Sequence, residues 1–86
     1  MDIKIEVPKY DLKTGIKYHW ENGFKIEVKS SDGVITLSAN KEGLLSLANH
    51  LLNLAQDEVP VGHHLHFDEY CSLEEGSLEL IIEKRL

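Results

Sequence analysis

The sequence predicts one α+β domain, residues 1–86, in which a long amphipathic helix covers one face of a mainly antiparallel sheet. Three observations predict this fold class. The chain of 86 residues is long enough for one hydrophobic core. Several segments alternate apolar and polar residues with the period of a strand, and one segment repeats leucine with the period of a helix. We expect about five to six strands in the order β-β-β-β-α-β-β, arranged as a two-layer sandwich whose second sheet face is open.

The first two expected strands lie near the N-terminus. Residues 3–7 alternate Ile and Val with charged residues, and Pro8 ends the pattern. Residues 16–20 alternate in the same way, and an Asn-Gly turn follows them. Tight pairing at that turn would place Trp20 opposite a lysine. Either the loop has another length, or Tyr18 and Trp20 form an exposed aromatic pair on the outer sheet face.

A hairpin is expected next, between strands at residues 24–29 and 34–39. An Asp-Gly dipeptide at 32–33 suits a two-residue turn. Such a turn pairs Val28 with Leu37, so that apolar residues face apolar residues across the two strands. The predicted register is therefore consistent with one buried face.

A helix is expected at residues 41–57, with Asn40 as its N-cap. Leucine and alanine form a broad stripe along it, and polar residues recur on the opposite side. We expect the stripe to be the core face and the polar side to face solvent. The stripe residues expected to pack on the sheet are Leu44, Leu47, Ala48, Leu51 and Ala55, and the polar side includes Glu42, Ser46, Asn49, Asn53 and Gln56.

Two further strands are expected after the helix. Residues 63–70 form the first, with Leu65 and Phe67 facing inward, and residues 78–83 form the second. If the two strands form a hairpin, the polar residues of both lie on its outer face. Those residues are His64, His66, Asp68, Glu79 and Glu83.

The composition excludes several classes of function. The formal net charge is −6, and residues 42–86 carry nine acidic against two basic side chains, which argues against nucleic acid as a ligand. No apolar run approaches a membrane span and no signal peptide is recognisable, so we expect a cytoplasmic protein without a membrane partner. The single cysteine, Cys71, is expected to be a half-buried, unreactive thiol. We expect no cofactor, because no phosphate-binding or zinc-finger motif is present.

A metal site is one interpretation of the spacing His64-x-His66-x-Asp68. On a strand these three side chains project from one face, and two imidazoles with a carboxylate can bind zinc or iron. The spacing resembles a segment of metallo-β-lactamase-type hydrolases, but Glu69 stands where those enzymes have a further histidine. The simpler interpretation is a polar, solvent-facing strand surface. We expect no dedicated metal site and keep a small metal-binding protein as an alternative.

The carboxylates of the last two strands suggest an interaction surface rather than an active site. Paired carboxylates can act as a general acid and base, but a two-layer domain of this size has little volume for a catalytic pocket. We therefore expect no enzymatic activity. The residues assigned to partner binding are His64, His66, Asp68, Glu69, Tyr70, Glu74, Glu75, Glu79 and Glu83.

The C-terminal part of the chain resembles the immunity protein 32 family. The resemblance spans residues 36–84 and leaves out residues 1–35. Its most specific part runs from His66 to Ser77, although a polar residue is usual in the family where this chain has Cys71. The segments that carry the resemblance are NKEGLLSLA at 40–48, GHHLHFDEY at 62–70, SLEEGS at 72–77 and ELIIE at 79–83.

The resemblance implies a protein that neutralises a toxin. Members of the family are attributed to bacterial polymorphic toxin systems, in which each protects the cell from its own toxin, and no catalytic residue comes with the family. An acidic domain with an open sheet face suits a basic toxin as the partner. The same open face also suits a homodimer or a general interaction module.

Overall fold

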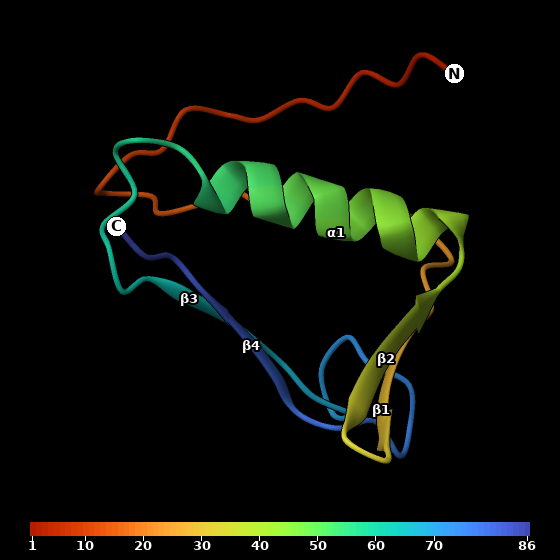
Figure 1. The fold of residues 1–86 in the computed structure, drawn as a ribbon. Helices are drawn as coiled ribbons and strands as arrows, with labels where there is room; N and C mark the ends of the chain where they lie inside the picture. The colour runs from red at the N-terminus through yellow and green to blue at the C-terminus, as the bar shows by residue number, and fades with distance from the viewer.

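The computed structural model describes residues 1–86 and contains one helix and four strands (Figure 1). The strands form two separate two-stranded antiparallel sheets, β1 with β2 and β3 with β4. The prediction of about five to six strands and a long helix is therefore wrong. The elements in chain order are β1 (Ile26–Ser31), β2 (Val34–Ala39), α1 (Lys41–Leu54), β3 (His64–Phe67) and β4 (Leu80–Glu83).

The strands expected at residues 3–7 and 16–20 do not form. Side chains of α1, rather than another strand, bind the backbone of both segments. The His19 N–H donates to Asn49 Oδ1 at 2.9 Å, and the Asn49 Nδ2 donates to the Glu6 carbonyl at 3.2 Å. Because the helix partners these backbone groups, the segments need no ladder of hydrogen bonds with a neighbouring strand.

The helix begins as predicted and ends early. The Asn40 side chain accepts a hydrogen bond from the Gly43 N–H at 2.8 Å, which confirms Asn40 as the N-cap. The helix ends at Leu54 rather than at the predicted residue 57. Just beyond its C-terminus, the Lys84 ammonium donates to the Gln56 carbonyl and so places a positive charge near the negative end of the helix dipole. No helix of the structure has the length and apolar character needed to cross a membrane.

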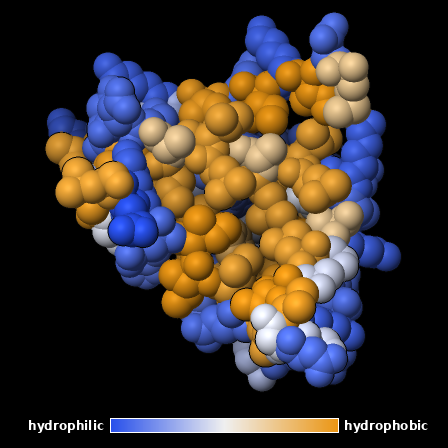
Figure 2. Space-filling model, in the orientation of Figure 1, coloured by the Kyte–Doolittle hydropathy of each residue, from blue (hydrophilic) through white to orange (hydrophobic).

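The side of α1 that packs against the protein is mainly polar and includes Leu47 and Leu54, so the prediction that the leucine stripe faces the core and the polar side faces solvent is wrong for most of the helix. Ser46 and Asn53 are fully buried, whereas Leu44 and Leu51 are 56% and 47% exposed. Of the five residues expected to pack on the sheet only Leu47 is buried; Ala48 is half-buried and Ala55 is exposed. Figure 2 shows apolar side chains over the area between α1, β2 and the pair β3–β4.

Hydrogen bonds explain how polar side chains come to lie inside. The Ser46 Oγ accepts from the Glu21 N–H at 2.8 Å and donates to the helix carbonyl of Glu42. The Asn53 Nδ2 donates to the backbone and side-chain oxygens of Asn49, at 2.9 and 3.1 Å. These buried groups are therefore paired, which removes most of the desolvation penalty that an unpaired polar group would bring.

The β1–β2 hairpin confirms the predicted register. Val28 pairs with Leu37 and Ile26 pairs with Ala39. Asp32 and Gly33 both have positive φ values, 52° and 79°, as a two-residue turn between strands of this twist requires. Local turn chemistry and side-chain alternation agree here, so one register is favoured.

The hydrophobic core lies between α1 and the inner sides of the two hairpins. His50 is buried in the aromatic part of this core, stacked on Tyr18 with ring centroids 4.4 Å apart and tilted against Trp20 at 4.2 Å. Tyr18 and Trp20 are half-buried, so the alternative of an exposed aromatic pair is wrong. The buried apolar residues are Ile26, Val28, Leu47, Leu54, Val59, Leu65, Phe67 and Leu73.

The loop between β3 and β4 connects the two sheets. The Glu74 N–H donates to the Ile26 carbonyl and the Leu78 N–H to the Val28 carbonyl, both at 2.8 Å. Residues 74–78 therefore lie along one edge of β1, while β2 occupies the other edge. The outer edge of β2 has no strand beside it.

Candidate partner-binding surface

The outer face of the β3–β4 hairpin carries the histidines and carboxylates that the sequence placed there. His64 pairs with Glu83 and His66 with Ile81 in the antiparallel register. Leu65 is buried on the opposite side of the same strand, as predicted. The hairpin expected from the alternation is therefore present, and its outer face is polar except for Ile81, which is 55% exposed.

His66 lies at the centre of this polar face. Its Nε2 lies 3.2 Å from Glu79 Oε1 and 3.7 Å from Asp68 Oδ2. The His66 side chain is about half exposed to solvent, and so is that of Glu79. Exposed polar contacts of this kind add little to folding stability, so the three groups remain available to a partner at small energetic cost.

Two carboxylates of the predicted surface shape the loop after β3. Asp68 Oδ1 accepts from the Tyr70 N–H at 2.9 Å, which forms a turn within the loop. Glu69 Oε2 accepts from the Gly76 N–H at 2.8 Å and holds the far side of the loop. Tyr70 itself is 90% exposed, so an aromatic ring projects from this loop into solvent.

The remaining carboxylates of the surface are exposed and have no cation beside them. Glu74, Glu75 and Glu83 are exposed, and no salt bridge includes them. Lys84, which follows Glu83 in sequence, has its ammonium bound to main-chain carbonyls instead. The surface therefore keeps its negative charge. We use the name acidic surface for His64, His66, Asp68, Glu69, Tyr70, Glu74, Glu75, Glu79 and Glu83.

Residues 34–85, more than half of the chain, match the family model described as Immunity protein 32. The chain belongs to the immunity protein 32 family. The matched region contains β2, α1, β3, β4 and every residue of the acidic surface. The resemblance drawn from the sequence is thus confirmed. No curated protein and no solved structure matches the chain.

The acidic surface of this immunity protein 32 family member does not form a metal-ligand group. No set of three or more His, Cys, Asp or Glu side chains is arranged to hold a metal ion. His66 approaches Asp68, but the contact of the His64 Nδ1 is with the Gly62 carbonyl at 3.4 Å. Cys71 is exposed rather than half-buried, because it lies in the loop outside the hairpin.

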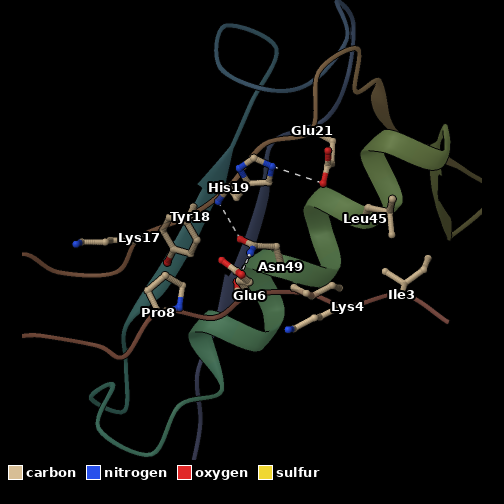
Figure 3. A pocket seen from close by; sticks show the side chains of 11 residues that line it. Ile3, Lys4, Glu6, Pro8, Lys17, Tyr18, His19, Glu21, Leu45 and Asn49 are labelled. Carbon is tan, nitrogen blue, oxygen red and sulfur yellow. Dashed lines mark hydrogen bonds and ion pairs between the residues drawn. The ribbon is translucent and has the colours of Figure 1, made fainter.

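A pocket of about 400 Å³, which no pattern in the sequence indicates, lies between residues 3–8 and α1 (Figure 3). Leu45 and Asn49 contribute to its wall from the helix, and Tyr18 from the extended segment. The Tyr18 hydroxyl is buried without a hydrogen-bond partner, and burial raises the pKa of that hydroxyl. Much of the wall comes from residues outside the part of the chain that matches the immunity protein 32 family. The pocket is therefore a feature of this chain's own N-terminal region.

Proposed function

We propose that this member of the immunity protein 32 family binds a cognate bacterial toxin and neutralises it by protein–protein contact, without catalysis of its own. The acidic surface is the part that faces the toxin. The observation that carries this placement is the row of exposed carboxylates Glu74, Glu75 and Glu83, none of which has a cation within salt-bridge distance. Unpaired surface charges favour a partner of the opposite sign, so the toxin is expected to present a basic patch.

The charge distribution of the chain supports the same placement. Nine acidic side chains against two basic ones give residues 42–86 a net charge of −7. Of the two basic ones, Lys84 binds the carbonyls of Gln56 and Val59 and does not neutralise the surface. A field of one sign accelerates encounter with a partner of the other sign.

Tight binding needs a large, well-packed side chain in the interface as well as complementary charge. In most interfaces a few large side chains contribute most of the binding energy, and aromatic residues are prominent among them. Tyr70 is the exposed aromatic residue of the acidic surface, and Asp68 fixes its backbone through the Tyr70 N–H. A ring presented on a loop of defined shape loses less conformational entropy on binding than one on an unrestrained loop.

The decisive experiment reverses three charges of the acidic surface to lysine, at Glu74, Glu75 and Glu79. Asp68 and Glu69 are left unchanged because their carboxylates hold the loop. We expect the association rate with the cognate toxin to fall about tenfold or more at low salt, and the difference from wild type to shrink as salt is added. Stopped-flow or surface-binding kinetics and survival on co-expression with the toxin are the measurements.

A matched control carries the same change in net charge elsewhere. Asp2, Asp57 and Glu58 are exposed and form no hydrogen bond or salt bridge through their side chains, so their reversal to lysine is a suitable control. We expect this control to protect the cell nearly as well as wild type. Equal losses in the two variants would mean that net charge alone matters and that the acidic surface is misplaced. Failure of wild type to protect or to co-purify with the toxin would contradict the immunity function itself.

A further inference from the structure

A second face of the molecule is apolar and uncovered. Ile35 and Leu37 of β2 lie on the side of the hairpin that also carries buried Val28, yet they are 69% and 39% exposed. Leu44 and Leu51 of α1 lie one turn to either side of the buried Leu47 and are about half exposed. Apolar side chains fill the area between these two elements and the β3–β4 hairpin in Figure 2. We use the name apolar face for Ile35, Leu37, Leu44 and Leu51.

The chain exposes more surface than a compact monomer of its size. A monomer of 9.8 kDa is expected to expose about 5,200 Å², and this chain exposes 6375 Å². Its radius of gyration is 13.7 Å, whereas about 12 Å is expected for 86 residues. The extended segment before residue 10 contributes part of the difference (Figure 1). With the part from that segment included, the excess is roughly 1,200 Å², against the 800 Å² or so that each partner contributes to a standard interface.

We propose that the apolar face is covered by the same face of a second copy of this chain, in a two-fold symmetric homodimer. The outer edge of β2 has no strand beside it, and an apolar edge left open in this way promotes aggregation. A second copy is present at the protein's own concentration at all times. A symmetric pair also closes on itself, so it covers the face without forming chains of molecules.

The carboxylates of the acidic surface are placed so that they do not oppose such a dimer by repulsion. On β3 the buried residues Leu65 and Phe67 alternate with His64 and His66 of the acidic surface. The acidic surface is therefore on the outer side of the β3–β4 hairpin, and the core and the apolar face are on its inner side. Two copies joined through the inner side keep their carboxylates apart and leave both acidic surfaces free. The homodimer goes beyond the proposed toxin binding and does not depend on it.

The test is the mass of the protein in solution and its response to paired substitutions. At about 100 µM we expect sedimentation to give twice the 9.8 kDa chain mass. The double variant Ile35→Lys/Leu51→Lys places two charges on each apolar face and is expected to sediment as a monomer. The control Leu12→Lys/Val34→Lys adds the same charge at exposed apolar positions outside that face and is expected to remain a dimer.

Each outcome decides for or against the homodimer. A monomeric wild type overturns it, and so does a dimer that the control disrupts as much as the double variant. If wild type is monomeric and the Ile35→Lys/Leu51→Lys variant no longer protects against the toxin, the apolar face is assigned to the toxin instead. Circular dichroism checks folding. If the double variant is unfolded, Leu44→Gln alone is measured, and an increase of less than tenfold in the dimer dissociation constant overturns the proposal.

Discussion

The two sides of α1 differ less in polarity than those of an ordinary surface helix. The side that faces the protein carries the buried polar residues Ser46, Asn49, His50 and Asn53 beside the buried Leu47 and Leu54, and the side that faces out carries half-exposed leucines such as Leu51. An amphipathic helix normally buries its apolar stripe. The difference shows that the orientation of a helix also depends on the hydrogen-bond partners that neighbouring segments require. Here the extended N-terminal segments need hydrogen-bond partners, and the polar side of the helix supplies them.

The two sides of α1 also differ in how far their side chains are hydrogen-bonded and packed within the chain. On the buried side each polar group finds a partner within the chain, and the His50 Nδ1 lies 2.6 Å from the Ser46 carbonyl. On the outer side the leucines Leu44 and Leu51 find only part of their packing within the chain. The buried side therefore determines the fold of one chain, and the outer side is where association with another molecule can contribute. Substitutions on the two sides test this contrast.

The largest effect is expected from Asn49→Leu. Asn49 is 5% exposed, accepts from the His19 N–H and donates to the Glu6 carbonyl, so its loss unpairs two N-terminal segments at once. Leaving these part-buried backbone groups without partners should lower the free energy of unfolding by about 2–4 kcal/mol. Urea denaturation followed by circular dichroism measures the change. A loss below about 1 kcal/mol would show that the polar side of the helix does not hold these segments.

Much of the fold could be predicted where local signals agree. The Asp32-Gly33 turn and the alternation on either side of it gave the β1–β2 register, and the Asn40 cap gave the start of α1. The orientation of α1 could not be predicted in the same way. A side chain that binds the backbone of a distant segment, as Asn49 binds Glu6 and His19, leaves no periodic pattern in the sequence. The periodicity alone therefore predicts a core face at the leucine stripe and strands in the N-terminal segments, and both predictions are wrong.

The acidic surface was predictable to a similar extent. Alternation in β3 and β4 placed His66 and Glu79 on one face, and the structure brings them to 3.2 Å. The hydrogen bonds of Glu69 within the loop and the binding of Lys84 to the Gln56 carbonyl were not predictable, because both depend on tertiary positions. These two contacts decide which charges of the region remain free.

A smaller effect is expected on the pH dependence of folding stability, and it tests the buried side of α1. Burial lowers the pKa of His50 below its ordinary value of 6.5, and the hydrogen bond with the Ser46 carbonyl opposes this only in part. As pH falls below about 6.5, the unfolded chain binds a proton at His50 that the folded chain does not bind, so stability decreases toward acid. The contribution is fully present above pH 6.5 and is lost as pH falls toward the lowered pKa.

The variant His50→Phe keeps an aromatic ring between Tyr18 and Trp20 and removes the titrating group. We expect its unfolding free energy to vary less between about pH 7 and pH 5 than that of wild type. Equal slopes for wild type and His50→Phe would mean that His50 binds its proton as readily in the folded chain as in the unfolded one.

The smallest effect is expected on the outer side, from Leu51→Ala. From its place in the leucine stripe this residue was expected to be core, where truncation lowers stability by about 2–5 kcal/mol. Leu51 is instead 47% exposed, and its truncation should lower the stability of the single chain by less than about 1 kcal/mol. Leu47 lies one turn away, is 8% exposed and provides the matched control, because Leu47→Ala should cause the full core loss. Both variants are measured by denaturation at concentrations where wild type is monomeric, so that association does not contribute. Similar losses at the two positions would mean that Leu51 is buried within one chain, and the contrast between the two sides of α1 would then disappear.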